Sequence, residues 1–264
     1  MVVVSTAIYS FYRMKPTCLI YGNCQGYGVG RFLEKTSFGY DVKIFQNYRL
    51  ILKEEDPADL HACAAKADLF IYQPINEKYG ELCTEHMLHE VIPKDCRTVS
   101  FACQFNSGIE PLIEHGTSIL GSEYVKALME IRDNQQIINA YHGGTVNFGM
   151  LARFLACAAE QARREVFCDV PMIDWILNNR TKRLFLTQNH PTSFLFAELA
   201  RRTISFLSGR QEPEIPIASW NEVGLPCGLP LSRYAVKEFG HNLPVDPEAE
   251  DHYKKLLDRI LNLR

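Results

Sequence analysis

The sequence lacks the cysteine spacings that hold a metal ion or build a disulfide framework. Nine cysteines are scattered over 264 residues, an odd number, with no C-x-x-C pair and no cysteine and histidine ladder of zinc spacing. Such thiols are typical of the reducing cytoplasm, where most of them are small core residues. We therefore predict a cytoplasmic protein with no metal ligands.

An excess of basic residues is also missing. The formal net charge is −3 at pH 7, and the isoelectric point is near 6.3. Binding to nucleic acid requires a positive surface that faces the phosphate backbone, so we expect no nucleic-acid partner. An apolar fraction of 47% with 22% charged residues is typical of a folded globular protein.

Long hydrophobic runs are scarce. Residues 1–9 are apolar but too few to span a bilayer, and no basic stretch precedes them. The apolar stretch 148–162 contains Arg153 and Glu160, which is typical of an amphipathic helix. We expect no membrane span. Residues 1–13 are predicted to form an N-terminal extension outside the fold.

What the sequence does contain is an alternation of strand-like and helix-like segments. Apolar runs of strand length occupy residues 17–21, 42–45, 68–72, 98–102 and 183–186, and helical patterns occupy 25–35, 56–66 and 77–89. This alternation predicts an α/β/α sandwich with a mainly parallel sheet. Residues 14–264 would form one domain with a helical insertion at about 121–180, followed by C-terminal helices at 193–207 and 248–261.

The common nucleotide-binding loops are absent. Gly22, Gly26, Gly28 and Gly30 follow the first strand, but their spacing does not fit G-x-G-x-x-G. No Gly-Lys-Ser/Thr follows, so a Walker A loop is excluded as well. Nicotinamide and ATP chemistry are thus minor alternatives.

The turn 22–26, Gly-Asn-Cys-Gln-Gly, carries the sharpest signal for chemistry. Cys24 would begin a helix, where unpaired N–H groups and the helix dipole lower the pKa of a thiol. The flanking glycines permit a tight turn and a close approach of substrate to the backbone. Cys24 could also be a small core residue, as we expect for the other eight cysteines. We favour a nucleophile.

Polar turns follow all five predicted strands, at 22–26, 46–49, 73–76, 103–108 and 187–192. Ligands of open parallel sheets bind at the carboxyl ends of the strands, so these turns should cluster. His190 in the last turn is a candidate acid and base for Cys24. It could instead be a helix-entry residue, and His142, beside Gly143 and Gly144, is its strongest rival.

Three further side chains in these turns are candidates. Gln73 and Asn106 carry amides that could stabilise an oxyanion or orient the histidine, although each is more often a turn residue. Arg49 is a candidate phosphate contact, although loop arginines are usually only solvated.

Together, Gly22-Asn23-Cys24-Gln25, the triplet Tyr72-Gln73-Pro74 and the late Asn189-His190-Pro191-Thr192 resemble the WcbI-type family of capsular polysaccharide biosynthesis acetyltransferases. The resemblance covers residues 14 to about 209, and the Gly-Asn-Cys-Gln element is its specific part. It implies an α/β/α sandwich that binds coenzyme A and acetylates a sugar hydroxyl. The identity of the sugar and the oligomeric state stay open.

The candidate site residues fall into two groups. Cys24, His190, Gln73 and Asn106 would be catalytic, and the ligand contacts would come from Asn23, Gln25, Gly26, Arg49, His142 and Gly143. The arrangement is similar to SGNH hydrolases, with Cys24 in place of their serine and Thr187 in place of their aspartate. An SGNH-like esterase or deacetylase and a non-catalytic binding module in polysaccharide assembly are therefore the alternative functions.

Overall fold

A four-stranded parallel sheet forms the centre of the fold. The computed structural model describes residues 15–115, 118–120, 130, 132–219, 221–224 and 228–262. The strands run in the order β2-β1-β3-β4; they are β1 (Thr17–Gly22), β2 (Asp41–Gln46), β3 (Leu69–Tyr72) and β4 (Arg97–Ser100). The predicted α/β class and mainly parallel sheet are confirmed. The predicted extension 1–13 and Cys227 lie outside the described residues.

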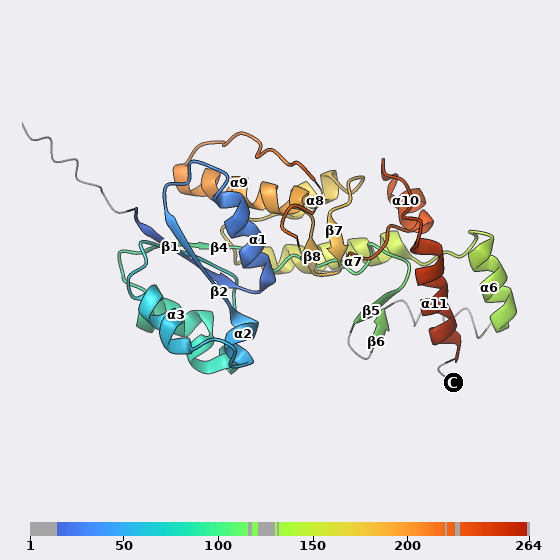
Figure 1. The fold of residues 1–264 in the computed structure, drawn as a ribbon, viewed down its shortest axis with the longest axis horizontal. Coiled ribbons are helices and arrows are strands. Elements are labelled where there is room, and N and C mark those ends of the chain that lie inside the picture. Colours follow the sequence, from blue (N-terminus) through green and yellow to red (C-terminus); the bar gives the residue numbers. More distant parts are fainter. Residues whose placement is uncertain are drawn as a thin grey trace, which may run out of the picture.

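Helices cover both faces of this sheet because successive strand residues point to opposite sides. Leu19, Tyr21 and Phe70 belong to one core cluster, whereas Cys18 and Ile20 belong to the other. The second cluster packs under α1 (Cys24–Leu33) and α9 (Ser193–Ser208), and Figure 1 shows α3 (Pro57–Ala64) on the opposite side. The remaining helices near the sheet are α2 (Asn47–Ile51), η1 (Glu77–Leu82), α4 (Thr84–His86) and a π-helical turn, η2 (Met87–Val91).

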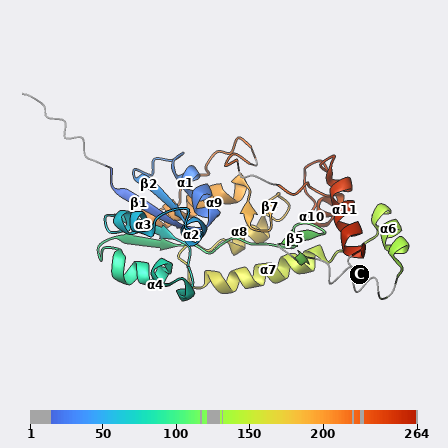
Figure 2. The same cartoon turned by 60° about the horizontal axis from the view of Figure 1, so that its bottom comes forward.

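The C-terminal helices gather at the opposite end of an elongated molecule. The helix α7 (Met150–Glu165) runs toward the sheet from this end, where α6 (Asn134–His142), α10 (Arg233–Phe239) and α11 (Ala249–Asn262) lie (Figures 1 and 2). Tyr141 of α6 stacks on Tyr234 of α10 with ring centroids 5.5 Å apart. The hairpin β5 (Ile113–His115) and β6 (Ser118–Leu120) and the helix α8 (Ile173–Asn178) complete the described elements.

One predicted strand does not join the main sheet. Residues 183–186 were expected to extend it, but β7 (Phe185–Thr187) pairs antiparallel with β8 (His190–Pro191) in a separate two-stranded sheet. The free edge of β4 is already used, because Val170 N–H donates to Ser100 O (3.1 Å) and Asp169 Oδ2 accepts from Ser100 N–H (2.8 Å). His190 therefore reaches the site from a small hairpin.

Two predicted helices also differ locally. The pattern at 77–89 folds as η1, α4 and η2 rather than as one helix, and Gly80 within it has a φ of 55°. The helix expected to begin after Asn147 begins at Met150, where Gly149 is the N-cap. Asn147 Oδ1 accepts from Gly149 N–H (2.8 Å), so this side chain shapes the approach to α7.

Gly108 marks the closest approach of a strand-end loop to a helix. A Cβ atom at this position would lie 2.2 Å from the backbone nitrogen of Phe154 in α7. Because the backbone of α7 cannot move aside cheaply, Gly108→Ala is expected to lower the free energy of unfolding by roughly 3 kcal/mol or more. Urea unfolding measures this change.

Gly26→Ala is the matched control for this substitution. Its Cβ would meet only a methyl group of Ile20, at 3.3 Å, and alanine favours the helix. We expect a change of less than about 1 kcal/mol. Equal losses in the two variants would contradict the packing inferred for Gly108.

Candidate active site

The site is built on the turn between β1 and α1. Asn23 is the N-cap of α1, and its Oδ1 accepts from Gln25 N–H (2.9 Å). Cys24 is the first residue of the helix and is half-buried. Gly28, one turn later, lies against Phe196 of α9, where a Cβ would come within 2.4 Å of the ring. This close packing fixes the direction in which α1 leaves the sheet.

Gln25 braces the strand-end turns against one another. Its side chain is fully buried, and its Nε2 donates to Gln104 O (2.7 Å) and to Asn189 O (2.8 Å). Its Oε1 accepts from Gln104 N–H (2.8 Å) and from Gln73 Nε2 (3.3 Å). A single amide thus connects the turn of Cys24 with the turns after β3, β4 and β7. Sequence reasoning assigned Gln25 to ligand binding, but its amide is fully used within the protein.

The pKa of Cys24 moves in the direction opposite to the one expected. Burial of the thiol raises this pKa, and the nearby Cys103 raises it further. The backbone N–H groups of Cys24 and Gln25 lower it, as the helix start predicts, but burial outweighs them. The expected low pKa is therefore wrong for the ligand-free protein, and Cys24 is a neutral thiol at neutral pH.

Two neighbours of Cys24 were not recognised from the sequence. Gly22 pairs with Gln46, so Cys24 and Tyr48 stand at equivalent positions two residues beyond adjacent strands. Burial raises the pKa of the Tyr48 phenol, and the Cys24 thiolate, once formed at high pH, raises it further. On the other side, Cys103 Sγ accepts from Asn23 Nδ2 at 3.2 Å. Knowledge of the strand order and register was needed to find both neighbours.

His190 enters the site beside the Gln25 brace. The strand β8 contacts α1, and Asn189, which precedes His190, receives the hydrogen bond from Gln25. Nδ1 of His190 lies 2.8 Å from Thr187 Oγ1, which donates its one hydrogen to Asn189 Oδ1 (3.1 Å). The hydroxyl oxygen therefore accepts from Nδ1–H of His190, and Nε2 keeps a lone pair.

This arrangement favours a neutral imidazole that can accept a proton. Burial lowers the pKa of His190, so the ring is uncharged at neutral pH. The structure gives Thr187 the contact that orients the ring of His190. A hydroxyl holds the tautomer without adding a negative charge, so it supports the imidazolium less than a carboxylate does.

Gln73 and Asn106 support the site rather than face it. Gln73 Oε1 accepts from Asn23 N–H (2.8 Å), and its Nε2 donates to Gln25. Asn106 Nδ2 donates to Phe154 O (3.2 Å), and its Oδ1 accepts from Gly108 N–H (2.8 Å). Both amides are buried and hold loops in place, so neither orients His190.

The first turn of α1 also uses its own N–H groups. Gly26 N–H donates to Asn23 O (3.0 Å), and Gln25 N–H donates to the Asn23 side chain. The N–H groups of Gln25 and Gly26 are therefore both used within the turn and are not free to bind an oxyanion in this structure. Asn23 acts here as a cap.

Arg49 lies near the site but is held by acidic neighbours. Its guanidinium pairs with Glu55 (2.7 Å) and with Glu54 (3.4 Å). These carboxylates also line an adjacent hollow with Asp56. A phosphate would have to compete with two glutamates for Arg49, so the predicted phosphate contact is not prepared in this structure.

His142 and Gly143 lie far from the other candidates. They end α6 at the opposite end of the molecule (Figure 1), where His142 pairs with Glu250 at 3.4 Å. The physical reason is the packing of Tyr141 into the C-terminal helices. The structure does not bring His142 to Cys24, whereas the turn of His190 is joined to the turn of Cys24 through Gln25.

Comparison with known proteins identifies the family. The family model for the polysaccharide biosynthesis enzyme WcbI matches residues 17–212, which include Cys24, Gln73, Asn106 and His190. The chain belongs to the WcbI family. No curated protein matches the sequence.

A solved WcbI structure shares the fold. Its TM-score with this chain is 0.67 at 18% sequence identity, over 94% of this chain and 90% of that one. It is described as the native protein, a polysaccharide biosynthesis enzyme, without a disulfide bond between coenzyme A and one of its cysteines. In the chain studied here, no helix of the described residues is long and apolar enough to cross a membrane.

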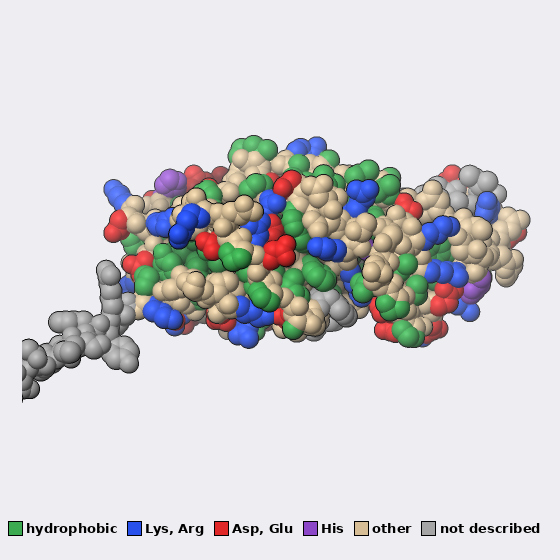
Figure 3. Space-filling model, turned by 90° about the horizontal axis from the view of Figure 1, so that it is seen from above, with side chains coloured by type: hydrophobic (Ala, Val, Ile, Leu, Met, Phe, Trp, Pro, Cys, Tyr) green, Lys and Arg blue, Asp and Glu red, His purple; other side chains and the backbone are tan. Residues whose placement is uncertain are grey.

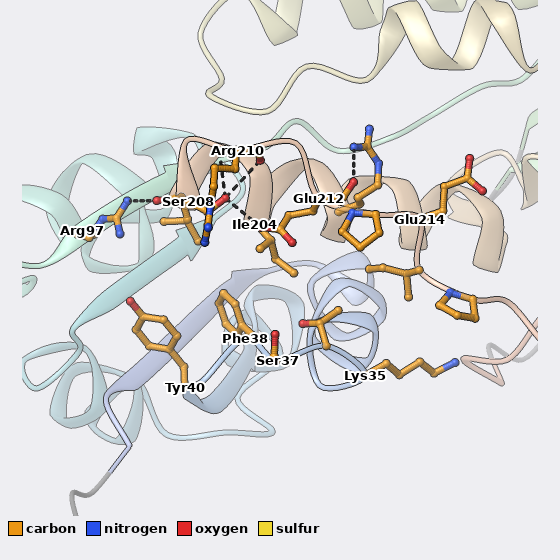
Figure 4. A pocket seen from close by; sticks show the side chains of 16 residues that line it. Lys35, Ser37, Phe38, Tyr40, Arg97, Ile204, Ser208, Arg210, Glu212 and Glu214 are labelled. Atoms are coloured by element: carbon orange, nitrogen blue, oxygen red, sulfur yellow. Dashed lines mark hydrogen bonds between the residues drawn. The ribbon is translucent and has the colours of Figure 1, made fainter.

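A cavity of about 440 Å³ in this WcbI family member lies away from Cys24. Tyr40 and Arg97, which line it, sit at the N-terminal ends of β2 and β4, whereas Cys24 follows the C-terminal end of β1. Figure 4 shows Phe38 and Tyr40 facing Arg210 across it. The face drawn in Figure 3 mixes acidic and basic side chains, so its described part has no continuous basic surface.

Proposed function

We propose that this protein is a coenzyme A-dependent acetyltransferase that acylates a sugar hydroxyl during capsular polysaccharide biosynthesis in the cytoplasm. The observation that carries the proposal is the connection between Cys24 and His190 through Gln25. This brace joins the turn of a half-buried thiol to the turn of an imidazole whose Nε2 has a lone pair. Membership of the WcbI family and the coenzyme A named for the solved neighbour support it.

In the proposed reaction, Cys24 and His190 begin as a neutral pair. His190 Nε2 takes the thiol proton as Cys24 Sγ attacks the thioester carbonyl of acetyl-coenzyme A. Coenzyme A leaves as a thiolate and takes the proton from His190. His190 then removes the proton of a sugar hydroxyl, whose oxygen attacks the acetyl-Cys24 thioester and releases the thiol. Transfer of the acetyl group from coenzyme A to Cys24 replaces one thioester with another, so its free energy changes little. The relay therefore needs no other co-reactant.

Two aromatic residues beside Cys24 offer ring faces on which the adenine and the pantetheine amides of coenzyme A can stack. Tyr27 lies one turn along α1 and is 38% exposed, and Tyr48 on α2 is 41% exposed. Exposed aromatic rings beside a half-buried thiol offer faces for stacking. The phosphates would be held elsewhere, because Arg49 is paired with two glutamates.

Coenzyme A is expected to raise the melting temperature of the protein. A ligand that binds only the folded state adds about 2.7 kcal/mol at a hundredfold excess over its Kd, which corresponds to roughly 5 °C or more for a chain of this size. A thermal shift measurement with protein free of bound nucleotide tests this. No shift at millimolar coenzyme A would remove it from the account.

Tyr48→Ala should weaken coenzyme A binding roughly fivefold, the effect of about 1 kcal/mol of lost stacking. Tyr40→Ala is the matched control, because Tyr40 precedes β2 at the amino ends of the strands, whereas Tyr48 follows β2 at their carboxyl ends. Its coenzyme A affinity should match that of the wild type. Equal affinity of all three proteins would place coenzyme A away from Tyr48.

Activity assays separate the alternative functions. Hydrolysis of a simple acetyl ester without coenzyme A would favour the SGNH-like esterase, for which the contact between Thr187 and His190 is the supporting observation. Absence of both coenzyme A binding and hydrolysis would favour a non-catalytic module.

A further inference from the structure

Cys103 brings a second thiol to the site. Its sulfur lies 3.2 Å from Asn23 Nδ2, and Asn23 directly precedes Cys24. Its neighbours along the chain are anchored, since Ala102 O accepts from Gln104 Nε2 (2.8 Å) and Gln104 N–H donates to Gln25 (2.8 Å). Cys103 therefore contacts the residue that precedes Cys24, and the two half-buried thiols lie near each other at the carboxyl ends of the strands although their loops are far apart in sequence.

The surroundings of Cys103 act on its thiol in opposite directions, and the net effect is a pKa above the ordinary value. Burial raises the pKa of Cys103, whereas the Asn23 amide and the charge of Arg164 lower it. The amide hydrogen bond would stabilise a negative sulfur where Cys24 also lies. Two other cysteines have different neighbours. Cys18 is fully buried under α1, and Cys157, which belongs to α7, contacts Ser107.

We propose that Cys24 and Cys103 form a reversible disulfide when the protein meets a low-molecular-weight disulfide. The Cys24 thiolate attacks one sulfur of the small disulfide, forms a mixed disulfide and releases one small thiolate. The Cys103 thiolate then attacks Cys24 Sγ and releases the second small thiolate. One small disulfide and two protein thiols become two small thiols and one protein disulfide, so atoms and electrons balance.

The consequence is a site whose Cys24 thiol is blocked under oxidising conditions and is restored by a reductant. A disulfide at Cys24 removes the thiol that the proposed acyl transfer uses, and it also prevents a small thiol from remaining attached to Cys24. The formation of this bond does not depend on the proposed function. It requires only two neighbouring thiols and an oxidant, so a disulfide without a nucleotide serves as the probe.

The test is incubation of the full chain with glutathione disulfide at pH 8.5, followed by peptide mapping without reductant. We expect a cross-linked peptide that contains Cys24 and Cys103. Dithiothreitol should reduce this cross-link and release the two separate peptides. In Cys103→Ser, Cys24 should stop at the glutathione adduct. Cys157→Ser, a control at another half-buried thiol, should still form the cross-link. Melting curves of the reduced variants verify that each is folded.

A stable glutathione adduct on Cys24 of the wild type, without the cross-link, would overturn the proposal. A cross-link that joins Cys24 to any other cysteine would overturn it as well. Coenzyme A binding, measured separately on the reduced protein, reports on the proposed function alone. A failure of one inference is therefore distinguishable from a failure of the other.

Discussion

Cys24→Ala and His190→Ala are each expected to lower turnover of acetyl-coenzyme A by roughly two to four orders of magnitude, the range for loss of a nucleophile or its base. Residues that act as a unit are not additive, so the double variant should be little worse than either single one. Turnover is measured as the release of coenzyme A in the presence of a sugar acceptor. The loss of the thioester absorbance monitors this release. Coenzyme A binding should largely survive in all three proteins.

His142→Ala is the matched control for this series. His142 is half-exposed at the far end of the molecule, so its loss should leave turnover near the wild-type value. Loss of turnover in His142→Ala together with normal turnover in His190→Ala would show that the base lies at the turn after α6.

Gln25→Met is expected to cost on the order of 4 kcal/mol of unfolding free energy. The change keeps the length of the side chain but removes its hydrogen bonds to three buried groups and to the half-buried Asn189 O, and each buried group left unpaired costs about 1–3 kcal/mol before the loops relax. Because the amide connects the turns of Cys24 and His190, turnover should fall as well. Urea unfolding and the turnover assay measure the two effects.

Gln135→Met is the matched control. It measures the effect of replacing glutamine with methionine where the amide holds no loops together. Gln135 is exposed on α6, and its Nε2 donates to Asn139 Oδ1 of the same helix (2.9 Å). We expect less than about 0.5 kcal/mol of change, as for an ordinary surface position. A small effect of Gln25→Met, similar to that of the control, would contradict the brace.

The sequence predicted the main elements well because their signals are local. The buried runs of β1 and β3 and the amphipathic helices α7, α9 and α11 lie within a few residues of their predicted ranges. The prediction that residues 183–186 extend the main sheet was wrong, because Asp169 and Val170 bond the edge of β4. No local sequence pattern shows which segment pairs with a sheet edge.

The site was predicted less completely because it depends on contacts between distant turns. Cys24 and His190 were predicted from motifs. Their turns lie together as expected, but His190 comes from a separate hairpin and not from a strand of the main sheet. Gln25 was misjudged, since its value as a brace is visible only when the turns after β4 and β7 are in place. The pKa of Cys24 was misjudged because a helix start is a local signal, whereas burial is set by the whole fold.

Protection of Cys24 from iodoacetamide by coenzyme A tests the central claim most directly. Because the pKa of Cys24 is raised, alkylation of the free protein should be slow at pH 7 and should accelerate as the pH rises and the thiolate forms. Saturating coenzyme A should suppress alkylation of Cys24 at least tenfold and leave that of Cys168, a half-buried thiol outside the site, unchanged. Unchanged alkylation of Cys24 in protein shown to bind coenzyme A would contradict the account.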